Sequence, residues 1–74
     1  MQRPEVHFES CHESGNVFYV LALVRAAMRK QRRINEYNEL RGRVLTQAGS
    51  YEEALAMMRE HVALIDDDGK YNEE

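Results

Sequence analysis

The fold of this chain is decided by residues 14–24, which read SGNVFYVLALV. Gly15 supplies a turn, and Asn16 can cap a helix by accepting a hydrogen bond from a main-chain N–H two or three residues on. The residues that follow are apolar on every side for about two turns, which is typical of a buried helix. The sequence therefore predicts that this helix lies at the centre of the core.

A strand is predicted before this helix, because apolar and polar residues alternate from Val6 to Cys11. Pro4 lies just outside it, and residues 12–15 make the turn into the helix. Six residues of the first helix follow the three-four spacing of one face: Val17, Val20, Leu21, Val24, Ala27 and Met28.

A second helical pattern follows without an intervening glycine or proline, and its apolar positions are Ile34, Tyr37, Leu40, Val44, Leu45 and Ala48. Asn35 is the best candidate for its cap, and a single bent helix is the alternative. Gly42 disfavours a helix by about 1 kcal/mol relative to alanine, which suggests a close packing contact. Gly49 ends this helix, and Ser50 with Glu53 forms a capping box for a third.

The third helix carries Ala54, Leu55, Met58 and Val62 on one stripe. Residues 62–65 are β-prone, and the turn-forming residues 66–69 end that strand. We therefore expect one α+β domain over residues 1–74, ordered over about 5–66, with 67–74 a frayed tail. Its order is strand, three helices, strand, with the helices on one face of a two-stranded sheet.

Length and cysteine content limit the class of protein. A chain of 74 residues forms one small core, and such domains often gain stability from a homodimer or another partner. Cys11 is the single cysteine, no signal pattern precedes it, and the apolar run is too short to span a bilayer. These features favour a cytoplasmic protein that does not enter a membrane.

Charge is divided unevenly along the chain. Residues 25–43 hold seven basic and two acidic side chains, a balance of 7 − 2 = +5, and the remainder has 3 − 11 = −8. Such a division favours self-association or a charged partner. The candidate partner-binding residues are Arg25, Arg29, Lys30, Arg32, Arg33, Arg41 and Arg43.

No metal, cofactor or catalytic motif stands out. His7, Cys11, His12 and His61 lack the paired spacing of a zinc site. The acidic run 66–68 fails the ligand spacing of an EF-hand. Nothing orients Cys11 and a histidine as nucleophile and base. We therefore expect a non-enzymatic protein with no cofactor.

Nucleic acid is the alternative partner of the arginine-rich segment. No aromatic residues interleave the arginines, and the pI of about 5.6 is low for a nucleic-acid-binding domain. The third helix begins with Glu52 and Glu53, which would repel phosphates in a helix-turn-helix. A protein with an acidic surface is therefore the favoured partner.

Several motifs resemble one group of known proteins: the strand, Gly15-Asn16 followed by Phe18, residues 35–37 and residues 51–53. The chain resembles small phage- and prophage-encoded proteins of unknown function over about residues 6–65. It departs from them in lacking a glycine between the first two helices and in its basic cluster, residues 29–33. The resemblance implies a phage accessory protein that binds a host or phage protein, and it implies no active site.

Overall fold

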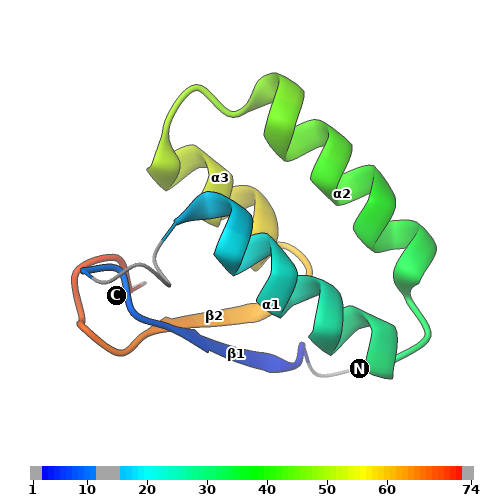
Figure 1. Ribbon diagram of the computed structural model, residues 1–74, viewed down its shortest axis with the longest axis horizontal. Helices are drawn as coiled ribbons and strands as arrows, with labels where there is room; N and C mark the ends of the chain where they lie inside the picture. The colour runs from blue at the N-terminus through cyan, green and yellow to red at the C-terminus, as the bar shows by residue number, and fades with distance from the viewer. Residues whose placement is uncertain (1–2, 12–15, 73–74) are drawn as a thin grey trace.

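The computed structural model describes residues 3–11 and 16–72. Three helices lie on one side of a two-stranded sheet: the first and third pack on its face, and the second packs against those two helices (Figure 1). The elements in chain order are β1 (Glu5–Phe8), α1 (Val17–Lys30), α2 (Ile34–Gln47), α3 (Tyr51–Arg59) and β2 (Ala63–Asp66). The predicted α+β order of strand, three helices and strand is confirmed.

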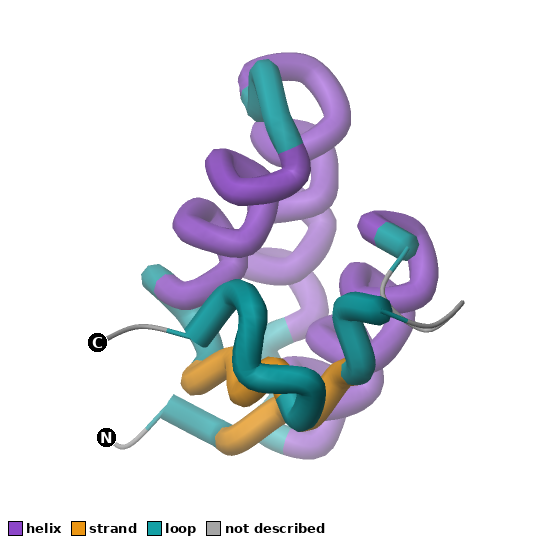
Figure 2. Tube along the Cα trace, turned by 90° about the vertical axis from the view of Figure 1, so that its left-hand side faces the viewer, coloured by secondary structure: helices purple, strands orange, loops and turns teal. Residues whose placement is uncertain are grey.

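The two strands come from opposite ends of the chain and pair in parallel. Val6 lies opposite Leu64, and Phe8 lies opposite Asp66. These four residues are buried against the helices, whereas Glu5 and His7 point to the exposed face. Figure 2 shows the helices gathered on one side of the strands. The alternation predicted for β1 therefore places its apolar residues in the core.

Two of the predicted helix caps are present. The Asn16 side chain accepts a hydrogen bond from the Phe18 N–H at 2.8 Å. Ser50 Oγ accepts one from the Glu53 N–H at 3.1 Å, and Glu53 Oε2 accepts one from the Gly49 N–H at 3.1 Å. The capping box thus starts α3, with its return bond one residue earlier than usual. The predicted turn at residues 12–15 lies outside the described residues.

The prediction that the first helix is buried on every side is wrong. One face of α1 lies in the core through Val20, Leu21, Val24 and Met28. Phe18 is 62% exposed and Tyr19 is 51% exposed. The helix lies at the surface of the molecule, because α2, α3 and β1 pack only against its inner side. A stripe of apolar residues is therefore left in contact with solvent.

The connection between α1 and α2 separates two helices as predicted but differs in its cap. α1 ends at Lys30 and α2 begins at Ile34, so the two helices are separate. The N-cap of α2 is Arg33, which makes no side-chain capping hydrogen bond, and Asn35 lies inside the helix. Arg32 turns the chain with a φ of 60°, a left-handed conformation that glycine adopts more easily. An arginine thus makes the turn for which the sequence offers no glycine.

The structure also differs from the sequence-based predictions at Gly42 and in the C-terminal segment. A Cβ atom at Gly42 would meet no atom within 4 Å, so the close contact predicted there is absent. The composition predicts a frayed tail from residue 67 onward, but residues 68–72 are hydrogen-bonded to Asp66, and the Tyr71 ring packs against the core. The described part of the tail therefore has defined contacts beyond the strand.

Candidate interaction surfaces

The seven basic residues predicted to bind a partner differ in exposure and in their contacts within the domain. Six of them are exposed, and five of these six form no ion pair with a described residue. These five are Arg25, Arg29, Lys30, Arg32 and Arg41. The remaining two, Arg33 and Arg43, are engaged within the domain.

Arg33 holds the connection between helices in place. Its guanidinium donates to Glu36 Oε2 at 2.8 Å, to Gln31 Oε1 at 3.0 Å and to the His61 carbonyl at 3.3 Å. The hydrogen bond from Arg33 lowers the pKa of the Glu36 carboxyl. Arg43 lies 3.7 Å from Glu60, beyond α3. These contacts make Arg33 a structural residue, which its place in a basic run did not reveal.

The exposed flanks of α1 and α2 form one surface, which we call the hairpin face. It consists of Phe18, Arg25, Arg29, Arg41 and Leu45. In α1, Arg25 and Arg29 follow Phe18 by seven and eleven residues, so the three share a stripe. In α2, Arg43 reaches toward Glu60, and Arg41 and Leu45 lie on the opposite flank. Leu45 and Val17 line the same groove of about 300 Å³, which places that flank beside α1.

A second surface lies along the outer edge of β1. The Ala63 N–H donates to the Pro4 carbonyl, and the Asp67 N–H donates to the Phe8 carbonyl. In this parallel register the main-chain groups of Glu5 and His7 point away from β2. β1 is therefore an edge strand whose outward N–H and C=O groups face away from the sheet.

A groove of about 440 Å³ lies between this edge and α1. On the helix side the groove is lined by the apolar side chains of Leu23, Ala26 and Ala27, two of which are small. Val6 lines it from the strand, and Lys30 stands at the C-terminal end of the helix. The groove and the strand edge are thus parts of one continuous surface, which we call the β1 edge surface.

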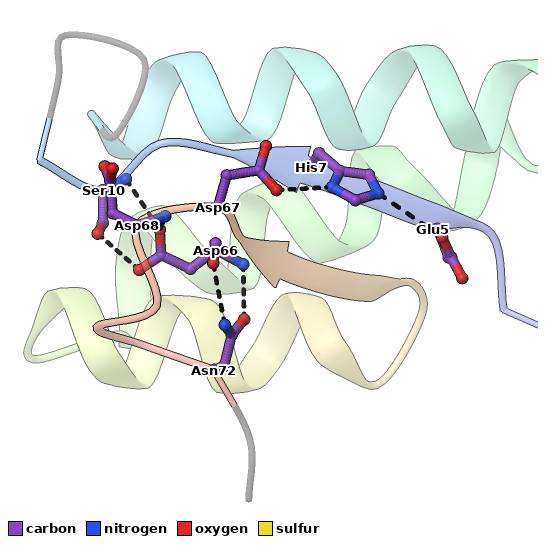
Figure 3. Close-up of polar contacts among 7 residues, drawn as sticks. All are labelled: Glu5, His7, Ser10, Asp66, Asp67, Asp68 and Asn72. Atoms are coloured by element: carbon purple, nitrogen blue, oxygen red, sulfur yellow. Dashed lines mark hydrogen bonds and ion pairs between the residues drawn. The ribbon is translucent and has the colours of Figure 1, made fainter.

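Opposite charges alternate on the exposed face of the sheet (Figure 3). His7 Nδ1 donates to Asp67 Oδ1 at 2.8 Å, and His7 Nε2 lies 3.6 Å from Glu5 Oε1. The hydrogen bond to Asp67 raises the pKa of His7, burial lowers it slightly, and the charges of Asp67 and Glu5 raise it further. His7 is therefore more readily protonated than an isolated histidine.

Asp66 organises the turn after β2, and this role was missed by sequence reasoning. Its carboxylate accepts hydrogen bonds from Ser10 Oγ at 2.6 Å and from the Ser10 and Asp68 N–H groups (Figure 3). It also accepts hydrogen bonds from the Lys70 and Tyr71 N–H groups. Burial raises the pKa of Asp66, but these hydrogen bonds outweigh it and hold the pKa at about 2. The run of three aspartates is the only sequence signal, and it does not show which one turns inward.

The described residues form no metal-binding group. Among residues 3–11 and 16–72 no group of three His, Cys, Asp or Glu side chains is placed to hold a metal ion. Cys11 is exposed, and its N–H donates to Asp68 at 2.9 Å. The His61 ring lies 3.6 Å from Glu36 on α2. His12 lies outside the described residues.

Comparisons with known families, curated proteins and solved structures identify no relative of this chain. In the described part of the chain, no helix is long and apolar enough to cross a membrane.

Proposed function

We propose that this chain is a small non-enzymatic module that binds an acidic protein surface through its hairpin face. The observation that carries the proposal is the position of Phe18, which is 62% exposed on the same stripe of α1 as Arg25 and Arg29. Aromatic and arginine side chains supply most of the binding energy in protein interfaces. The hairpin face combines the two on one rigid pair of helices.

The arginines of this face are suited to a carboxylate-bearing partner. Arg25, Arg29 and Arg41 form no ion pair with the described residues, so binding breaks no ion pair within that part of the chain. A guanidinium pairs with a carboxylate through two parallel hydrogen bonds, which gives the contact a defined geometry. Phe18 and Leu45 then provide apolar contact area between the charges. A host or phage protein fits the resemblance to phage-encoded chains.

The alternative is that the same face binds nucleic acid. The free arginines support it, but two observations favour protein. The apolar residues Phe18 and Leu45 lie among them, and acidic side chains dominate the rest of the chain. The acidic side chains outside residues 25–43 would repel the long phosphate backbone of a nucleic acid. A protein partner that contacts only the hairpin face would not meet these acidic side chains.

The test is capture of partners from a nuclease-treated cell lysate with the tagged chain, read by mass spectrometry. A protein enriched by the wild type is then purified, and its affinity is measured by calorimetry for wild type, Phe18→Ser and Arg41→Ala. We expect roughly a tenfold or greater loss of affinity for Phe18→Ser and a smaller loss for Arg41→Ala.

Arg43→Ala is the matched control, because Arg43 lies two residues from Arg41 on the other flank of α2. It removes the same charge and should leave the affinity within about twofold. Equal affinity of wild type and Phe18→Ser would contradict the proposal. Binding to DNA or RNA of any sequence with a steep dependence on salt would favour the alternative.

A further inference from the structure

The two outer edges of the sheet are treated differently. On β2, the side chain of Asn72 accepts from the Asp66 N–H at 2.6 Å and donates to the Asp66 carbonyl at 2.9 Å. It occupies the place that a neighbouring strand would take. On β1, the outward groups of Glu5 and His7 have no such cover from a described side chain. The β2 edge is therefore covered at Asp66, near its C-terminal end, whereas the β1 edge has no such cover at Glu5 or His7 and is open to pairing.

The open edge of β1 lies beside a groove lined by apolar side chains of α1. Leu23, Ala26 and Ala27 line the groove along β1, and the exposed Tyr19 lies on the adjoining stripe of α1. A two-stranded sheet is marginal by itself, and further strands together with apolar cover stabilise it. An added strand at this edge that also carries a helix would satisfy the sheet and the groove together.

We propose that a second copy of this chain binds the β1 edge surface, pairing its own β1 antiparallel to the first around a two-fold axis at Val6. In that register Glu5 of each copy lies opposite His7 of the other, and the two exchange main-chain hydrogen bonds. The alternating charges of β1 are therefore self-complementary. An unrelated strand would have to supply this charge order, whereas a second copy carries it already.

The same two-fold symmetry brings α1 of the second copy to the groove beside β1. A two-fold axis perpendicular to the sheet keeps the helices of both copies on one face of a continuous four-stranded sheet. The two α1 helices then lie side by side above the paired β1 strands. Ala26 is small enough to let the helices approach, and Leu23 of each copy packs toward the groove of the other. This flank of α1 is separate from the hairpin face, so either proposal can fail alone.

Disulfide cross-linking tests the register directly. Val6 would face its own symmetry mate as a non-hydrogen-bonded pair, with Cα atoms about 4.5 Å apart, which a disulfide can bridge. In a Cys11→Ser background, Val6→Cys should form a covalent dimer under mild oxidation. Leu64→Cys in the same background is the matched control, since Leu64 is the buried neighbour of Val6 one strand further from the axis. It should remain monomeric on a non-reducing gel.

A second test measures dimer affinity by sedimentation equilibrium. It uses substitutions at exposed positions, which do not alter the core. Glu5→Lys would place a cation opposite His7 twice in the dimer and should weaken association at least tenfold. Glu39→Lys makes the same charge change on the exposed side of α2 and should leave association within about twofold.

Three outcomes would overturn the proposal. The first is a wild-type chain that stays monomeric up to about 1 mM, a concentration at which only association weaker than about 4 kcal/mol escapes detection. The second is equal cross-linking of the Val6→Cys and Leu64→Cys chains. The third is an equal effect of Glu5→Lys and Glu39→Lys, which would show a general effect of net charge.

Discussion

The side chain of Asn72 pairs with both main-chain groups of Asp66, accepting a hydrogen bond from the N–H at 2.6 Å and donating one to the carbonyl at 2.9 Å. A residue from the C-terminal segment thereby substitutes for a strand at the outer edge of β2. The arrangement joins the turn after β2 to the sheet, so the segment up to Asn72 belongs to the folded domain.

Replacing Asn72 by alanine should destabilise the domain by about 1–2 kcal/mol, because two hydrogen bonds to a buried residue are lost. Urea unfolding followed by circular dichroism measures the change. Asn72→Asp is the informative comparison, since it keeps the acceptor and removes the donor. A midpoint unchanged in Asn72→Ala would show that the edge is closed in some other way.

Stability should fall in acid because of Asp66. Its pKa is lowered in the folded state from 3.8 to about 2. A group whose pKa is lowered by folding stabilises the protein above its unfolded pKa, and this contribution is lost as the pH falls through the folded pKa. We therefore expect the unfolding free energy to decline from about pH 4 to pH 2.

Asp66→Asn is the control for that assignment. The amide keeps the size of the side chain but cannot accept all five hydrogen bonds, so the variant should lose about 2–4 kcal/mol at pH 6. Its remaining stability should vary less between pH 4 and pH 2 than that of the wild type. The same slope in both proteins would assign the acid sensitivity to other carboxylates.

Gly42→Ala should stabilise the domain by about 1 kcal/mol. Gly42 lies inside α2, and an added Cβ meets no atom within 4 Å, so only the gain in helix propensity remains. Thermal unfolding of the two proteins gives the comparison. A loss of stability would indicate a contact at this position, for instance with another copy of the chain.

Tyr51→Phe should also stabilise the domain. The Tyr51 hydroxyl is buried and has no hydrogen-bond partner within the described chain, while its ring packs edge-on against Tyr71 at 5.1 Å. Burial raises the pKa of this hydroxyl. Phenylalanine keeps the ring contact and removes the unpaired group, which should yield about 1 kcal/mol in denaturant unfolding. A destabilised variant would point to a hydrogen-bond partner of the hydroxyl that the described residues do not supply.

Arg32 and Arg33 should respond in opposite directions. Arg32→Gly relieves a left-handed residue and should stabilise the domain by about 1 kcal/mol. Arg33→Ala removes the hydrogen bond to the His61 carbonyl and should destabilise it by about 1 kcal/mol. Chemical denaturation distinguishes them, and equal effects would contradict the structural role of Arg33. A double alanine variant would mix folding with binding, so the partner tests above use Phe18 and Arg41.

The sequence by itself determined the elements and the inward faces. The Asn16 cap, the Ser50–Glu53 box and the three-four spacing of the apolar residues are local signals, because each depends on neighbours within one or two turns. The alternation of Val6 and Phe8 likewise needs only the two-residue period of a strand.

Only the tertiary structure decided which surfaces are available to a partner. Whether α1 is covered on all sides depends on where α2 and β1 pack, and their coverage leaves Phe18 and Tyr19 exposed. Arg33 and Asp66 owe their roles to His61 and Ser10, which are distant in the chain. Composition and periodicity describe a residue's local neighbours, whereas these contacts arise between segments that meet only when the chain folds.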